Sequence, residues 1–161
     1  MGLDMYLTAE KYVTARDYST NPPSRTPLYT QLLDLLPLEE QRLLDPAPSG
    51  TTLEFRVGYW RKANAIHSWF VQNVQGGIDE CQKSYVDEVS LQTLKDLCET
   101  LLTSRDEQEA RRSLPPTEGF FFGSYGIDAC YWSDLESTVD ICTRALQLTK
   151  RGYFIHYQSS W

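Results

Sequence analysis

The sequence predicts an α+β fold, with a mainly antiparallel sheet of about four strands and three main helices packed on it. Two short segments alternate apolar and polar residues, which is typical of half-buried strands, and two further aromatic-rich segments are also expected to be strands. Three longer segments place apolar residues three and four positions apart, which is typical of amphipathic helices. The order of these segments lacks the repeated strand–helix–strand alternation of a parallel sheet. The chain has 161 residues, the size of one domain, and we expect residues 1–161 to form one.

The predicted strands are residues 2–8, 51–59, 118–126 and 153–160. In the first strand, Leu3, Met5 and Leu7 lie on one face, because side chains alternate between the two faces of a strand. The same spacing in the second strand predicts a buried face made of Leu53, Phe55, Val57 and Tyr59.

The predicted main helices are residues 60–74, 90–102 and 133–151. Ser90 is the expected N-cap of the second helix, because a serine hydroxyl can accept a hydrogen bond from a free backbone N–H. In the third helix, Ser133 and Glu136 have the spacing of a capping box, and Gly152 follows the last turn. The apolar stripes of these two helices include Cys98 and Cys142, which we expect to fill the core.

A proline-rich stretch occupies residues 22–48 and contains six of the eight prolines. Within it, Pro27 directly after Thr26 predicts the start of a short helix, since proline is favoured in the first helical turn. We expect residues 20–50 to form an insertion on the single domain. The polar segment 104–117 is expected to be a surface loop or a frayed helix end.

The net charge of −7 argues against a nucleic-acid-binding protein, which usually carries a basic stripe, and is compatible with a basic protein partner. No two of the four cysteines have CxxC spacing, so neither a zinc ribbon nor another metal or cofactor site is predicted. We expect no signal peptide and no membrane span, because the chain has no basic leader and no long apolar run. These features predict a cytoplasmic protein with four reduced thiols.

The stretch from Gly58 to Phe70, GYWRKANAIHSWF, is the densest motif in the chain. On a helix that begins at Trp60, His67 lies in the middle of the apolar arc. We therefore expect His67 to be buried and neutral, with its ring satisfied by Asn64 or by backbone groups. The functional alternative makes His67 a general base in a pocket, with an acidic residue such as Glu54 as its partner.

Trp69 lies on the opposite side of the same helix, near Lys62. It either packs under the proline-rich insertion or anchors a partner protein, since tryptophan is enriched at binding hot spots. Arg61 and Lys62 would supply charge-assisted contacts beside it. A different interpretation is a binding pocket for a small molecule or nucleotide, lined by Trp60, Asn64, His67, Tyr125 and Tyr131.

Four motifs, MGLDMYL, VGYWRKANAIHSWFV, FFFGS and YQSSW, resemble those of a family of small uncharacterised proteins of phages, prophages and bacterial chromosomes. They span most of the chain. The segment DECQKSY around Cys81 departs from the DDCGEYY pattern that is commoner in this family. The resemblance implies a phage or mobile-element setting and assigns no chemistry. Together with the small size and acidic balance, it predicts a non-enzymatic interaction protein, such as an inhibitor of a host defence or regulatory protein.

Overall fold

The computed structural model describes residues 2–44, 48–117 and 126–161. The chain divides into two compact units, which are described separately. Residues 1–9 and 55–161 form one unit, called here the main unit. Residues 10–54 form the other, called here the proline-rich unit, which contains the whole of the predicted insertion.

A four-stranded antiparallel sheet in the order β4-β1-β6-β5 confirms the predicted α+β class. The strands are β1 (Asp4–Thr14), β4 (Gly50–Arg61), β5 (Ser84–Val86) and β6 (Phe154–Ser160). β5 pairs with β6 in antiparallel register, with Tyr85 opposite His156. β1, β4 and β6 confirm three of the four predicted strands, whereas almost all of the fourth, 118–126, lies outside the described residues.

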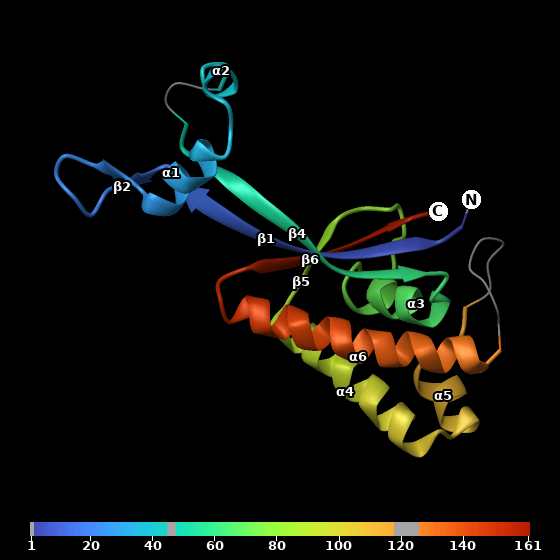
Figure 1. The fold of residues 1–161 in the computed structure, drawn as a ribbon. Coiled ribbons are helices and arrows are strands. Elements are labelled where there is room, and N and C mark those ends of the chain that lie inside the picture. Colours follow the sequence, from blue (N-terminus) through green and yellow to red (C-terminus); the bar gives the residue numbers. More distant parts are fainter. Residues whose placement is uncertain (1, 45–47, 118–125) are drawn as a thin grey trace. The chain divides into compact units, whose positions relative to one another are not determined.

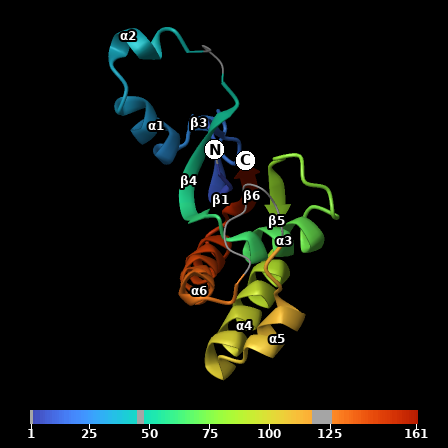
Figure 2. The same cartoon turned by 90° about the vertical axis from the view of Figure 1, so that its right-hand side faces the viewer.

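The helices of the main unit are α3 (Asn64–Asn73), α4 (Glu88–Ser104), α5 (Glu107–Ser113) and α6 (Ala129–Thr149). α3, α4 and α6 correspond to the three predicted main helices. They lie on the same side of the sheet, with α4 and α6 side by side (Figures 1 and 2). α6 packs against α3, β6 and α4, so it joins the sheet to the outermost helix.

The capping residues of α4 and α6 differ from those predicted. The carboxylate of Asp87 accepts a hydrogen bond from the Ser90 amide at 2.7 Å, so α4 begins before Ser90. The carboxylate of Asp128 accepts from the Tyr131 amide at 3.0 Å, so α6 begins four residues before the predicted box at Ser133. An aspartate caps as well as a serine does, and here it lies further upstream.

Two other predicted features near these helices also change. Glu136, the second member of the predicted capping box, instead forms an ion pair with Arg105 at 2.7 Å. The polar segment 104–117 contains a short helix, α5, whose N-cap Asp106 accepts hydrogen bonds from the amides of Gln108 and Glu109.

The core of the main unit is apolar and includes the predicted face of β1. Leu3, Met5 and Leu7 are fully buried, as the alternation predicted. The rings of Phe70 and Tyr157 stack face to face with centroids 4.0 Å apart, which joins α3 to β6.

All four cysteines are free, as predicted, and Cys98 and Cys142 are buried between α4 and α6. Burial raises the pKa of the Cys98 thiol, and it raises that of Cys142 to about 12. These two thiols therefore act as small apolar side chains.

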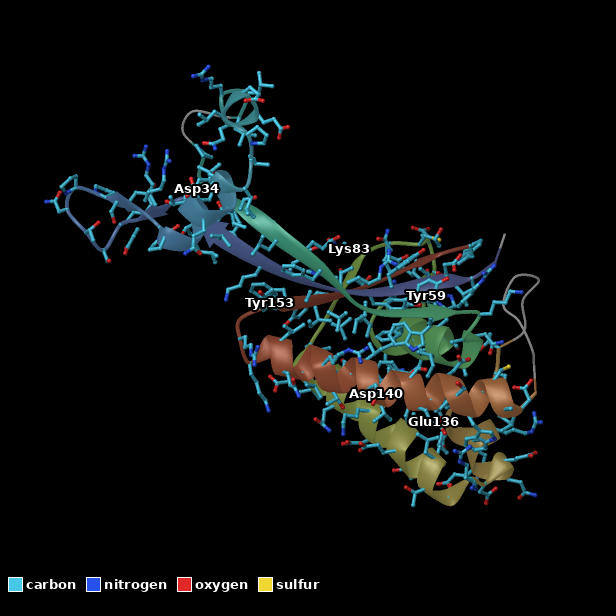
Figure 3. The ribbon with its side chains drawn as sticks, in the orientation of Figure 1. Asp34, Tyr59, Lys83, Glu136, Asp140 and Tyr153 are labelled. Atoms are coloured by element: carbon cyan, nitrogen blue, oxygen red, sulfur yellow. The ribbon has the colours of Figure 1, made fainter. Side chains whose placement is uncertain are left out.

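The predicted buried face of β4 is wrong. Phe55 and Tyr59 are about half exposed, whereas Gly58 and Trp60, on the opposite face, are buried. A Cβ atom at Gly58 would lie 2.3 Å from Cγ2 of Ile141, so the glycine is what allows α6 to approach the strand. On the outer face, the phenol of Tyr59, labelled in Figure 3, donates a hydrogen bond to the Asp4 carboxylate on β1.

The proline-rich unit contains two short antiparallel strands, β2 (Arg16–Asp17) and β3 (Ser24–Arg25), and two helices, α1 (Pro27–Asp34) and α2 (Leu38–Gln41). α1 begins at proline with Thr26 as its N-cap, as predicted. The buried core of this unit consists of Val13, Ala15 and Tyr29. Such a small core buries little apolar surface for a unit of this length.

Candidate functional site

The Gly58–Phe70 stretch is a strand, a sharp turn and a helix. β4 runs through Trp60 to Arg61, and α3 begins at Asn64. Lys62 forms the turn, with φ = 62°, and its amide donates to the Leu3 carbonyl at 2.8 Å. Trp60 therefore belongs to the sheet, and a helical wheel that begins at Trp60 is wrong for the first four residues.

His67 is buried, as predicted, with 2% of its surface exposed. Its Nδ1 lies 2.7 Å from the Tyr157 hydroxyl, and its Nε2 lies 2.9 Å from Oδ2 of Asp79. A neutral ring with its proton on Nε2 satisfies both partners, since it donates to Asp79 and accepts from the Tyr157 hydroxyl. Burial raises the pKa of Tyr157, which keeps its phenol protonated as the donor.

The partners of His67 differ from those that the sequence predicted. The amide oxygen of Asn64 instead accepts from the Thr117 backbone at 3.1 Å. Glu54 is exposed and belongs to the proline-rich unit, so Asp79 replaces it as the carboxylate beside the ring. The arrangement is a structural network, because both ring nitrogens of His67 already have partners. The rings of His67 and Tyr157 are also both buried.

The network extends to the end of the chain. Oδ1 of Asp79 lies 3.3 Å from Nε1 of Trp161, which donates to it, and 3.5 Å from the Ser159 hydroxyl. This contact docks the terminal tryptophan on Asp79. One aspartate thus ties α3 and the segment between α3 and β5 to the last residues of β6.

Trp69 is not an exposed anchor, which was one of the two alternatives that the sequence left open. Only 8% of its surface is exposed, and its ring packs edge-to-face against Phe70 with centroids 5.4 Å apart. The reason is that α3 is covered on more than one side, and seven of its ten residues are buried. Arg61 and Lys62 are exposed, but the buried ring of Trp69 offers little surface to a partner beside them.

A pocket of about 460 Å³ lies between the β4–α3 turn and the start of α6, and it is called here the Lys62 pocket. Its charged and polar lining residues include Arg61, Lys62, Asn64, Asp128, Tyr131 and Asp134. Arg61 and Lys62 were predicted to bind a partner, and Asn64 and Tyr131 to bind a ligand. Neither Trp60 nor His67 lines it, and Tyr125 lies outside the described residues.

Trp60 nevertheless holds two walls of this pocket together. Its indole N–H donates to the Thr138 hydroxyl at 2.9 Å, and that hydroxyl donates to the Asp134 carbonyl at 2.6 Å. Both groups are in the interior, so the link between β4 and α6 is shielded from water. Trp60 is therefore a positioning residue that does not itself face the pocket.

Asp134 carries a perturbed carboxyl in this pocket. Its pKa is raised to about 6, first because burial disfavours the charge and second because Asp128 is nearby. No sequence signal singles out this shift, because it depends on how α6 packs against the β4–α3 turn. Tyr131 also has a raised pKa through burial, and its hydroxyl donates to the Leu114 carbonyl at 2.9 Å.

The raised pKa of Asp134 predicts a stabilising substitution. A carboxyl whose folded-state pKa lies above its unfolded value lowers stability as the pH rises from about 4 through 6. Asp134→Asn should therefore raise the free energy of unfolding by about 1 kcal/mol at pH 7, allowing for solvent screening of a partly exposed group. Urea unfolding at pH 7 and pH 4.5 would measure this, with a smaller gain expected at the lower pH.

Asp140→Asn is the matched control, since Asp140 is an exposed carboxylate on the same helix (Figure 3). It should change stability by less than about 0.5 kcal/mol at either pH. Equal effects of the two substitutions would show that burial of Asp134 carries no free-energy penalty.

A second surface of interest is the leucine segment, residues 28–44 of the proline-rich unit. It exposes six leucines, with Leu43 86% and Leu35 78% exposed, and the others are Leu28, Leu36, Leu38 and Leu44. A hollow of about 390 Å³ beside it is lined by Leu33, Leu44, Arg16 and Arg25, among other residues. Sequence reasoning predicted the helix here but not the exposure of its apolar side chains.

Comparison of the chain with protein-family models, with curated proteins and with solved structures finds no match. Within the described ranges, no cluster of His, Cys, Asp and Glu side chains has an arrangement that would hold a metal ion. Over the same ranges, no helix has the length and apolar character needed to cross a bilayer. The Lys62 pocket and the leucine segment are therefore the two candidate functional features of the described chain.

Proposed function

We propose that this is a non-enzymatic interaction protein, and that the proline-rich unit binds a partner protein through the leucine segment and the adjacent hollow. The observation that carries the proposal is the exposure of six leucines in a unit with three buried core side chains. Exposed apolar patches of this kind mark interaction sites in soluble proteins.

The hollow indicates the chemistry of the partner. Arg16 and Arg25 are directly opposite each other across the β2–β3 pair, and both line the hollow. Like charges at opposite positions of an antiparallel pair repel each other. Among the described residues, neither arginine forms an ion pair, so a carboxylate from outside would relieve this repulsion.

The partner that fits is a protein segment with one acidic side chain between apolar side chains, such as one face of an amphipathic helix. Its carboxylate would bind Arg16 and Arg25, and its apolar side chains would cover Leu43 and Leu44. Asp34, labelled on α1 in Figure 3, and the nearby Glu39 and Glu40 would favour basic residues at the rim of that segment.

The resemblance to phage and prophage proteins suggests that the partner is a host protein. In that setting, the protein would act in the host cytosol as an inhibitor of a defence or regulatory system. Four free cysteines are in keeping with a reducing compartment.

The test compares capture of bacterial proteins by the parent chain and by three variants. Leu35→Gln/Leu43→Gln changes the two most exposed leucines of the segment, and Arg16→Gln/Arg25→Gln neutralises the hollow. Val89→Gln is the matched control, because Val89 is an equally exposed apolar residue on α4 of the main unit. All three should keep the parent's melting temperature, since surface substitutions usually change stability by less than about 0.5 kcal/mol.

We expect a captured protein, purified and titrated by calorimetry, to bind the parent and Val89→Gln equally. The leucine variant should weaken its binding by about thirtyfold or more, which corresponds to the loss of a hot spot. The arginine variant should weaken it by about tenfold. Equal binding by all four proteins would refute the proposal. So would light scattering showing that the leucine segment only joins two copies of this chain.

A further inference from the structure

The Lys62 pocket has charges of both signs that remain uncompensated. Arg61 and Lys62 line one wall and Asp134 lines the other, yet no ion pair joins them in the part of the chain that the structure describes. Within the same part, the carboxylate of Asp134 has no hydrogen-bond partner. Asp134 is partly buried, whereas Arg61 and Lys62 are exposed. Charged groups that are not paired within the protein are available to a bound molecule, and a partly buried one gains most from a partner.

The backbone at Lys62 also points to a binding role. Its positive φ lies in the left-handed region, which a glycine adopts without the steric cost that a side chain imposes. Strain of this kind is often found at functional sites. Here the strained residue is a lysine that lines the pocket, next to Arg61 in the chain.

We propose that the Lys62 pocket binds a nucleoside monophosphate with a guanine base, whose phosphate contacts Arg61 and Lys62 and whose base contacts Asp134. The pocket volume of about 460 Å³ lies within the range of small-molecule sites. The guanidinium of arginine matches phosphate oxygens with two parallel N–H donors, and the lysine adds a second positive charge.

The choice of base follows from Asp134. An ionised carboxylate only accepts hydrogen bonds, and it has two oxygens side by side. The edge of guanine that carries N1–H and the N2 amino group presents two parallel donors, which match those oxygens. The corresponding edge of adenine presents a donor and an acceptor, so it can satisfy only one. Ala65, Ile66 and Leu135 supply apolar surface for the flat faces of the base.

Calorimetric titration at pH 7.5 with GMP, guanosine, AMP and inorganic phosphate tests the proposal on the intact chain. We expect GMP to bind, and guanosine and AMP each to bind about tenfold more weakly or worse, since each lacks one charge-assisted contact. Phosphate alone should bind far more weakly than GMP, because it makes no contact with Asp134.

Two variants separate a binding role from a structural one. Arg61→Gln/Lys62→Gln should reduce the affinity for GMP to that of guanosine. Asp134→Asn should bind GMP more weakly and should bind XMP, whose base is xanthine, more tightly than the parent does. In xanthine a carbonyl replaces the guanine amino group, and the asparagine amide can donate a hydrogen bond to it. Asp140→Asn, the control on the same helix, should bind GMP as the parent does. A change of base preference is a readout that partial unfolding cannot produce.

Lys62→Gly keeps the proposal testable if the double variant unfolds, since glycine relaxes the turn and removes the ammonium. It should fold at least as well as the parent and bind GMP about tenfold more weakly. No binding of GMP at about 1 mM would refute the proposal. Binding that survives in Lys62→Gly and Asp134→Asn, or phosphate that binds as tightly as GMP, would refute it as well.

Discussion

Trp69→Ala is expected to lower the free energy of unfolding by about 3–5 kcal/mol, the usual cost of truncating a buried aromatic side chain. The ring is 8% exposed and packs edge-to-face on Phe70, so alanine would leave a cavity beside a ring that itself stacks on Tyr157. Urea denaturation followed by far-UV circular dichroism would measure the loss as a lower transition midpoint.

Trp161→Ala provides a control with the same change of side chain. Trp161 is 45% exposed, and its indole N–H donates a hydrogen bond of 3.3 Å to Asp79. We expect it to cost less than about 1.5 kcal/mol. A loss for Trp69→Ala no larger than that for Trp161→Ala would mean that the Trp69 ring does not lie in the core.

The position of Trp69 shows what a helical wheel can and cannot predict. The wheel correctly placed His67 and Phe70 on a buried side. It assigned Trp69 to solvent because it assumed that one side of the helix is open. α3 is a short helix beneath a sheet and against α6, so a side chain that points away from the first contact meets a second.

The partners of His67 could not be predicted from local sequence. Asp79 and Tyr157 are 12 and 90 residues away along the chain. Periodicity reports which face of an element is apolar, and it is silent on which distant polar group satisfies a buried ring. The same limit applies to Asp134, whose raised pKa depends on the packing of α6 against the β4–α3 turn.

The strand β4 illustrates a different limit. Two of its aromatic residues, Phe55 and Tyr59, point outward, whereas a glycine and Trp60 point inward. A glycine has no apolar side chain, so the alternation pattern counts it as neutral even where it allows a helix to approach the strand. In the proline-rich unit the sequence pattern misleads in the opposite sense. Its leucines suggest a buried core, but six of them are exposed.

His67→Leu is expected to lower the free energy of unfolding by about 2–4 kcal/mol, although leucine is apolar and fits a buried position. The loss arises from the partners left behind. The Tyr157 hydroxyl, which is fully buried, would have no acceptor, and the Asp79 carboxylate would lose a donor that it holds at 2.9 Å. Chemical denaturation at pH 7 would measure the effect.

A double-mutant cycle with Tyr157→Phe separates the lost hydrogen bond from the lost packing. Phenylalanine keeps the stack on Phe70 and removes only the hydroxyl, so that His67→Leu in this background leaves no orphaned phenol. In the Tyr157→Phe background, His67→Leu should lower the free energy of unfolding by at least about 1 kcal/mol less than it does in the parent protein. This difference is the coupling expected of residues in direct contact. Strict additivity would show that the Nδ1–hydroxyl contact of 2.7 Å contributes nothing to stability, and the structural role of this network would then rest on Asp79 alone.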